Sequence, residues 1–314
     1  MRWSSRIPVT VLAVLTAIGC RSDRPAAETP SATNVVEVTA VERTFQAPDT
    51  VPAGWTTFRF RNASTMTHFA VVERMPEGIG VAEQQEEAAP IFQAGMDLMA
   101  AGKADEAAAK FGELPEWFGK VVFLGGPGLT APGHVSEATV DLEPGTYVLE
   151  CYVKTDGVFH SYNPDPAAYG MVHELTVTAP ASPTTEPQAD LALTISSAGG
   201  IEMSGEPSAG RQTIAVHFAD QTVHENFVGH DVHLVRLADD TDLGKLVAWM
   251  DWTQPGGLQI PAPVEFLGGL NEMPSGATGY MTITLEPGNY AWIAEVPHAD
   301  DKGMLKKFSV PAAG

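Results

Sequence analysis

An internal repeat constrains the fold of this chain more than any other feature. The first half contains Phe123-Leu124-Gly125-Gly126 and Leu142-Glu143-Pro144-Gly145, and the second half contains Phe266-Leu267-Gly268-Gly269 and Leu285-Glu286-Pro287-Gly288. The same offset also matches Tyr147 with Tyr290, Gly133 with Gly276 and Thr139 with Thr282. Because one constant offset aligns all these positions without a gap, the two halves are predicted to be duplicated domains.

The length of the chain agrees with two domains. It has 314 residues, and a typical domain has about 150. A stretch rich in Pro, Ser and Thr follows residue 178 and is typical of a linker. We therefore expect domain 1 at residues 35–179, a linker at 180–188 and domain 2 at 189–314.

Both halves predict β-structure. Each consists of short alternating or β-branched segments separated by Gly and Pro turns, which is typical of an all-β sandwich or Greek-key barrel. The expected strands are 35–41, 55–61, 68–73, 138–142, 147–152 and 171–177 in the first half, and 191–195, 212–218, 232–237, 281–285, 290–295 and 305–310 in the second.

One segment of the first half breaks this pattern. Residues 81–114 are rich in Ala, Glu, Gln and Met, which favours a helix or helical hairpin broken near Pro90 and Gly102. We expect a helical insertion that forms a local lid on the first barrel. Met96 and Met99 lie in it, and methionines on an amphipathic helix usually pack in a core.

The amino terminus predicts export. Arg2 and Arg6 precede an apolar run, 7–18, that is too short to span a bilayer, and a small residue stands directly before Cys20. This pattern resembles a bacterial lipoprotein signal. We expect residues 1–20 to be the signal peptide, Cys20 the lipidation site and residues 21–34 a flexible tether. The alternative is an ordinary signal peptide with an incidental cysteine.

The predicted location is therefore periplasmic or at the cell surface, anchored to the membrane by the N-terminal lipid. The formal net charge is −21. A strongly acidic surface repels phosphate backbones, so we expect no nucleic-acid partner, whereas basic partners or cations are attracted.

Cys151 is the only other cysteine. A single thiol in an oxidising compartment tends to be buried and inert, or to be held as a metal thiolate. Cys151 ends a predicted strand, His160 follows on the next loop, Gly170-Met171 leads into the last strand of this half, and His68 lies near an earlier strand.

This arrangement resembles the copper-binding end of the cupredoxins, the blue type 1 copper family of plastocyanin and azurin. The resemblance implies tandem cupredoxin-like domains, with one type 1 copper in domain 1 bound by His68, Cys151, His160 and Met171. Two imidazoles, one thiolate and a distant thioether suit copper in both oxidation states, so an electron moves with little rearrangement.

The loop after His160 departs from the family pattern. Ten residues separate His160 from Met171, more than is usual in cupredoxins, so residues 161–166 are expected to fold out of the way. His173 lies two residues after Met171, on the same face of a strand, and is the weaker alternative for the axial ligand. It could also be a strand residue at the barrel rim.

The second half lacks the thiolate, because Ala294 stands where the repeat places Cys151. Here His233 was matched to His68, and His298 and Met304 were matched to His160 and Met171. These residues predict a vestigial second site that could bind copper weakly. The alternative is a domain that has lost its metal.

Electron transfer by a lipid-anchored carrier, with a redox protein as a possible partner, is the leading functional expectation. The alternatives are copper capture or delivery, and a metal-free tandem module for binding or assembly. We expect no enzyme, since multicopper oxidases and nitrite reductases carry a histidine beside the cysteine. Here the neighbours of Cys151 are Glu150 and Tyr152.

Overall fold

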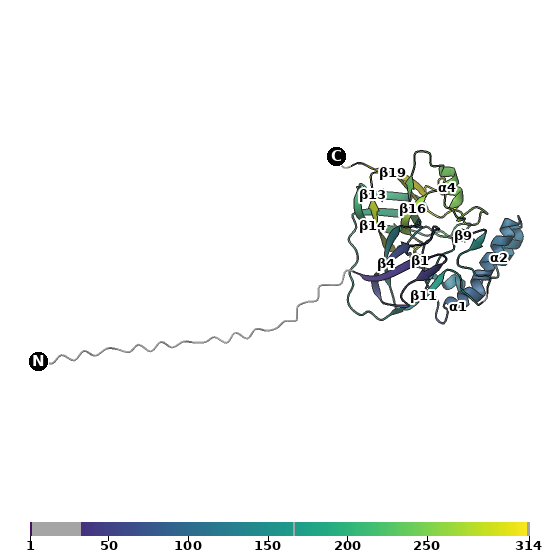
Figure 1. The fold of residues 1–314 in the computed structure, drawn as a ribbon, viewed down its shortest axis with the longest axis horizontal. Helices are drawn as coiled ribbons and strands as arrows, with labels where there is room; N and C mark the ends of the chain where they lie inside the picture. Colours follow the sequence, from purple (N-terminus) through teal and green to yellow (C-terminus); the bar gives the residue numbers. More distant parts are fainter. Residues whose placement is uncertain (2–32, 166, 313–314) are drawn as a thin grey trace.

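The structure is a computed structural model that describes Met1, residues 33–165 and residues 167–312. The expected lipidation site, Cys20, and most of the expected tether lie outside these residues. The described chain forms two β-sandwich domains with helices on one side (Figure 1). The predicted all-β class is confirmed.

Domain 1 contains a four-stranded and a five-stranded sheet. The first has the order β2-β1-β4-β7 and consists of β1 (Asn34–Val41), β2 (Thr44–Gln46), β4 (Gly54–Asn62) and β7 (Val135–Leu142). The second has the order β3-β11-β8-β5-β6 and consists of β3 (Thr50–Pro52), β5 (Val71–Arg74), β6 (Val122–Phe123), β8 (Gly145–Glu150) and β11 (Val172–Thr178). Alternate residues of β1 and β4 are buried, as period-two patterning requires.

Domain 2 repeats this arrangement. Its first sheet has the order β13-β12-β14-β17 and consists of β12 (Leu191–Ser196), β13 (Gly200–Ser204), β14 (Gly210–Phe218) and β17 (Thr278–Leu285). Its second has the order β16-β15-β18-β19 and consists of β15 (Val232–Leu237), β16 (Glu265–Leu270), β18 (Gly288–Ile293) and β19 (Leu305–Val310). Every strand of domain 2 thus has a counterpart at the same place in domain 1.

The two domains join through equivalent strands. Strands β7 and β17 pair antiparallel, so that one continuous eight-stranded sheet crosses the molecule. Ala138 faces Met281 in this pair, and the two are equivalent positions of the repeat. The domains are therefore related by an approximate twofold axis through this contact.

The repeated Phe-Leu-Gly-Gly segments form a second contact around the same axis. Pro127 bridges to Leu270, its equivalent, and the Gly268 amide donates to the carbonyl of Leu129 at 2.8 Å. A side chain at Gly128 would overlap the backbone of Gly269. The repeated glycines Gly126 and Gly269 are each required within their own domain, since a Cβ there would overlap the carbonyl of Ala70 and of Val232, respectively.

The second repeated motif fixes a turn. The hydroxyl of Tyr147 donates to the carbonyl of Glu143 at 2.9 Å, and that of Tyr290 donates to the carbonyl of Glu286 at 2.8 Å. Each bond closes the turn between two strands and satisfies a largely buried phenol. The tyrosine therefore recurs together with the turn.

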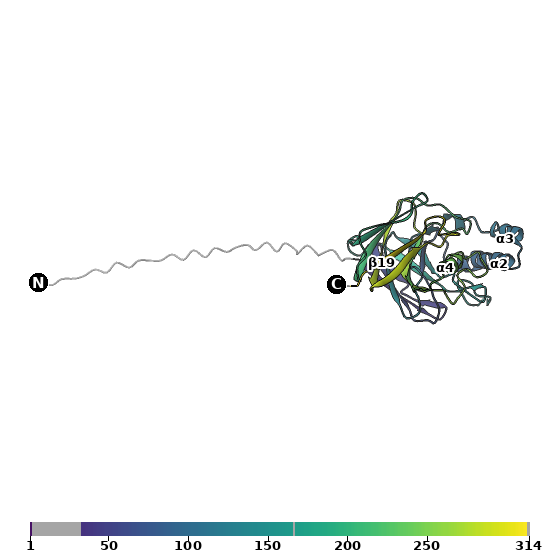
Figure 2. The same ribbon diagram turned by 90° about the horizontal axis from the view of Figure 1, so that it is seen from above.

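The helical insertion lies between β5 and β6 and projects from the sandwich (Figures 1 and 2). Pro90 stands in the first turn of its longest helix, and Gly102 has a φ of 74° between two helices, at the two predicted breaks. Its elements are α1 (Val81–Glu83), the π-helical turn η1 (Gln84–Ala88), α2 (Ala89–Ala100), α3 (Ala104–Phe111) and the 3₁₀ turn η2 (Phe118–Lys120).

Domain 2 has a shorter helix at the corresponding place, between β15 and β16. This helix, α4 (Leu243–Trp249), was not expected from the sequence, and Asp242 caps it by accepting a bond from the Lys245 amide at 3.1 Å. Within the described part of the chain, none of the helices is long and apolar enough to cross a membrane.

Candidate metal centre

Three side chains from separate segments meet at one end of domain 1. His68 precedes β5, Cys151 directly follows β8, and His160 directly follows the short strand β10 (Val158–Phe159). His68 Nδ1 lies 3.4 Å from Cys151 Sγ and 3.3 Å from His160 Nδ1. The three side chains are buried, with at most 2 % of any residue exposed.

These separations fit a single metal ion. Metal–nitrogen and metal–sulfur bonds of about 2.0 and 2.3 Å, the values known for zinc, place the ligand atoms of a three-coordinate ion about 3.5 Å apart. Two nitrogens and one sulfur that face a common point form the donor set that favours copper over hard, oxygen-seeking cations. The residues present therefore fit a type 1 copper ion.

Hydrogen bonds fix the ring of His160 and the backbone of His68. His160 Nε2 lies 2.7 Å from the Thr155 hydroxyl, and donation from this nitrogen directs the lone pair of Nδ1 at the cluster. The backbone of His68 is fixed by a two-bond bridge to Thr130, with distances of 2.8 and 3.2 Å. Neither ring requires rearrangement to bind a metal.

Burial sets the charge of the three donors. Loss of solvent lowers the pKa of His68 to about 4, and that of His160 to about 3 with a further contribution from His68. Burial raises the pKa of the Cys151 thiol to about 12, against opposing hydrogen bonds from the backbone of Phe69 and Val153. The imidazoles are thus neutral and ready to ligate, whereas the thiol must release its proton to a bound metal.

A hairpin carries the chain from Cys151 to His160. Strand β9 (Lys154–Thr155) pairs with β10, and Asp156 and Gly157 form the turn with φ values of 52° and 78°. Domain 2 supports this hairpin from outside. The Lys154 amide donates to the carbonyl of Leu258 at 2.8 Å, and its buried ammonium donates to the carbonyl of Trp252 at 2.8 Å.

The long segment after His160 leaves the site and returns to it. The Met171 amide donates to the carbonyl of His160 at 2.6 Å, which closes the excursion, and the Cys151 amide donates to the carbonyl of Met171 at 3.1 Å. Gln85 of the helical insertion binds both ends, through the carbonyl of Ser161 at 2.9 Å and the amide of Gly170 at 2.7 Å. Met171 is fully buried beside the cluster.

His173, the weaker candidate, does not join the cluster. Its ring is half-buried on β11, and its Nε2 donates to the carbonyl of Pro48 at 3.1 Å. The closure of the loop at Met171 puts that residue, and not His173, next to Cys151 and His160.

The predicted second site, His233 with His298 and Met304, does not form. His233 pairs with Ile293 in domain 2, and Val71 pairs with Glu150 at the equivalent place in domain 1, so His233 is the counterpart of Val71. His68 lies three positions before Val71, and its counterpart is therefore His230. The Met304 amide binds the carbonyl of Ala299, as that of Met171 binds His160. The counterpart of His160 is therefore Ala299, and the matches of His233 and His298 were wrong.

The structure also places both residues elsewhere. His298 is exposed. His233 Nδ1 accepts the Leu129 amide at 3.0 Å, so its Nε2 carries the proton and donates to Asp231 at 2.8 Å. Asp231, His233 and Glu295 lie close enough to suggest a metal site, but neither imidazole nitrogen of His233 has a free lone pair.

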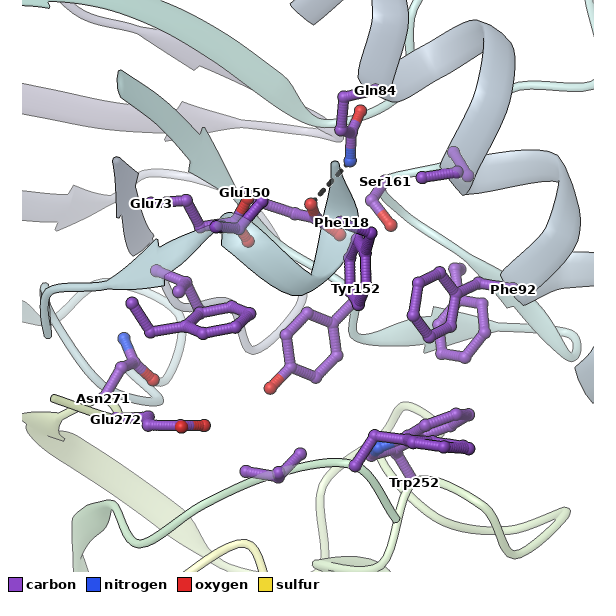
Figure 3. A pocket seen from close by; sticks show the side chains of 18 of the residues that line it. Glu73, Gln84, Phe92, Phe118, Glu150, Tyr152, Ser161, Trp252, Asn271 and Glu272 are labelled. Carbon is purple, nitrogen blue, oxygen red and sulfur yellow. Dashed lines mark hydrogen bonds between the residues drawn. The ribbon is translucent and has the colours of Figure 1, made fainter. Parts of the chain in front are cut away.

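A pocket lies between the two domains (Figure 3). Glu150 and Tyr152, the neighbours of Cys151 in the chain, are among the residues that line it. Tyr152 reaches into it, and it encloses about 880 Å³ with its mouth. Aromatic side chains, including Phe92, Phe118 and Trp252, line one side of the pocket, and carboxyl groups line the other.

The carboxyl groups of the pocket are Glu73, Glu150, Glu272 and Asp231. Burial raises the pKa of Glu73 well above its usual range, with a further contribution from the neighbouring Glu150. Burial also raises the pKa of Glu272 to about 7, against a hydrogen bond from the Gly229 amide. Glu73 and Glu272 therefore retain protons at a pH where exposed carboxyls lose them.

Sequence reasoning missed the residues that support the site. Lys154, Thr155 and Gln85 position the two ligand loops, but no local pattern marks them, because their partners are distant in the chain. The Asp156-Gly157 pair is the exception, since it is a strong hairpin signal that could have identified the turn.

Two buried imidazoles and a thiol thus meet at the strand ends of a β-sandwich, as the resemblance of the sequence to cupredoxins implies. Models of protein families give no match to the chain, and neither do curated proteins. Solved structures do match.

Auracyanin A, a blue copper protein from Chloroflexus aurantiacus, is 21% identical, with 47% of this chain and 100% of that chain covered and a TM-score of 0.27. Reduced auracyanin from Roseiflexus castenholzii is 25% identical, with 47% and 99% covered and a TM-score of 0.25. A copper-containing nitrite reductase from Thermus scotoductus is 12% identical, with 89% and 62% covered and a TM-score of 0.22.

Proposed function

We propose that domain 1 binds one type 1 copper ion through His68, Cys151 and His160, with Met171 as the axial ligand, and that the protein is an exported electron carrier held at the membrane by a lipid on Cys20. The observation that carries the copper assignment is the convergence of three buried donor atoms at 3.3 and 3.4 Å.

Bound copper supplies a one-electron redox couple, and the chain supplies a fixed environment for it. Thr155 and the bridge to Thr130 hold the imidazoles, and burial excludes water from the donors. A set of ligands held in this way changes little between oxidation states, which favours electron transfer.

Burial of the ligands also favours electron transfer over copper delivery. A copper-delivery protein must release its ion, which is easiest when the ligands are exposed. Here domain 2 supports the hairpin between Cys151 and His160, and Gln85 secures the second ligand loop. Retention of the ion, and hence an electron carrier, is the better fit. Since Glu150 and Tyr152 flank Cys151, no adjacent histidine supports a second, catalytic copper.

The test is the visible spectrum of the chain from Ser31 onward after addition of Cu(II), beside that of a Cys151→Ala variant. An intense charge-transfer band that is lost in the variant supports the type 1 site. The absence of a band in both proteins contradicts it and favours the metal-free binding module. Rapid transfer of copper to a weak chelator, despite a band, favours delivery over electron transfer.

A further inference from the structure

Domain 2 contains two buried imidazole nitrogens that lack a partner. Nε2 of His224 and Nε2 of His230 are both inaccessible to solvent and make no hydrogen bond to any described residue. Buried polar atoms are nearly always satisfied, so two adjacent exceptions point to a missing ligand. The two ring centroids are 5.2 Å apart, close to the 5.0 Å between His68 and His160.

One member of the pair, and a buried methionine near it in the fold, occupy positions of the candidate ligands of domain 1. His230 is the counterpart of His68, as the strand pairing establishes. Met304 is the counterpart of Met171, since the Ala294 amide donates to its carbonyl at 3.0 Å, as the Cys151 amide does to Met171 at 3.1 Å. Met304 is buried, with 1 % exposed.

His224 provides an imidazole where the repeat offers only Ala299. It comes from the loop before β15, and this loop packs on the strand end and on the loop that leads to Met304. Asn226 donates to the carbonyl of Glu295 at 2.9 Å, and Glu225 lies 3.5 Å from the Lys302 ammonium. The second imidazole thus reaches the site from a different segment than in domain 1.

The other nitrogen of His230 fixes its tautomer. Nδ1 lies 3.3 Å from the carbonyl oxygen of Asp220 and 3.6 Å from a carboxylate oxygen of the same residue. Both are acceptors, so the proton resides on Nδ1 and the lone pair on Nε2. A carboxylate behind an imidazole is a common support for a metal-ligating histidine.

We propose that His224, His230 and Met304 form a second metal site in domain 2, which binds Cu(I) through two imidazoles and a thioether. The donors are all neutral, so they favour a soft monovalent ion over a hard divalent one. The site has no thiolate and is therefore colourless. It differs from the predicted vestigial site in both histidines, and it does not require domain 1 to bind copper.

The experiment counts the Cu(I) ions that the chain from Ser31 onward holds against a competing Cu(I) chelator without oxygen. Cys151→Ala alone would leave two imidazoles and a thioether in domain 1, so His160→Gln is combined with it, and we expect this double variant to hold one equivalent where the parent holds two. Addition of His230→Gln or His224→Gln to this variant should remove that equivalent. His217→Gln in β14, which loses a bond to Thr278 and no proposed ligand, should leave it unchanged.

Two results would overturn the second site. One is a double variant, Cys151→Ala with His160→Gln, that holds no Cu(I). The other is an equivalent of Cu(I) that survives His224→Gln and His230→Gln. Met304→Leu tests the thioether without removing an imidazole, and we expect about a tenfold loss of affinity. Failure of the type 1 proposal is distinguishable, because it removes the visible band and leaves the Cu(I) of the double variant in place.

Discussion

The two domains share a scaffold and differ in what its strand ends carry. The order of strands, the tyrosine that closes a turn and the buried methionine recur in both. At the two positions that hold Cys151 and His160 in domain 1, domain 2 has Ala294 and Ala299. The residues that build the fold and the residues that bind the metal have therefore diverged independently.

The loss of donors has not made domain 2 dispensable. Its strands continue the central sheet through the pairing of β17 with β7. Its loop at Trp252 also holds the hairpin between the two candidate ligands Cys151 and His160. Lys154 is fully buried in this contact, and such a group is tolerated only when its hydrogen bonds are satisfied. Domain 2 thus supports the candidate metal site of domain 1 without supplying a donor to it.

The largest expected change follows from restoring one missing donor. Ala294→Cys puts a thiol beside His224 and His230, and completes the two-imidazole, one-thiolate set. In a Cys151→Ala background, Cu(II) should then generate a charge-transfer band that the Cys151→Ala variant itself does not show. The visible spectrum measures this, and the expected result is a band where there was none.

The matched control is Ala291→Cys, which buries a thiol in the middle of β18 and away from its end. This variant should remain colourless. If Ala294→Cys binds copper without a band, the strand ends of domain 2 do not have the geometry of those of domain 1. That result would contradict the claim that the two domains share one scaffold.

The sequence predicted the scaffold well because its signals are local. Alternation, turn residues and the repeat identified twelve strands close to their positions, and the helices begin and end near the expected breaks. Short strands such as β2, β3 and β13 were missed, because three to five residues give too little periodicity to be recognised. His68 also precedes its strand, which begins at Val71.

The candidate site was predictable only in domain 1. There a thiol marks the strand end, and the loops could be anchored to it. In domain 2, no donor marks the register, and both loops differ in length from those of domain 1. The connection before β15 is six residues longer than that before β5, and the segment from Ala294 to Met304 is ten residues shorter than that from Cys151 to Met171. His233 and His298 were therefore chosen in place of His230 and Ala299, an error that only strand pairing corrects.

The next effect concerns the two glycines that precede the buried methionines. Gly170→Ala would drive its methyl group into the Ser161 backbone, whereas Gly303→Ala meets only ordinary contacts at a φ of 70°. We expect a loss of about 3 kcal/mol for the former, from a backbone clash, and about 1 kcal/mol for the latter, from the left-handed conformation. Denaturant unfolding measures both, and equal losses would contradict the tight closure of the domain 1 loop.

The last expected effect tests the pocket between the domains. Domain 2 has Glu272 there, and the equivalent residue of domain 1 is the apolar Leu129. Burial raises the pKa of Glu272 from 4.5 to about 7, so the folded state keeps a proton that the unfolded state releases. Stability from this group is full below pH 4.5 and is lost as the pH rises through 7, by about 3 kcal/mol in all. Glu272→Gln still accepts the Gly229 amide.

This variant should therefore show a smaller fall in melting temperature between pH 5 and pH 8 than the parent, by about 5 °C. Glu286→Gln, which removes an exposed carboxylate from the same domain, should retain the parental slope. Because burial also raises the pKa values of Glu73 and Glu295, part of the slope should persist in Glu272→Gln. An unchanged slope would mean that Glu272 is already ionised in the folded protein, and that a cation or ordered water compensates its charge in the pocket.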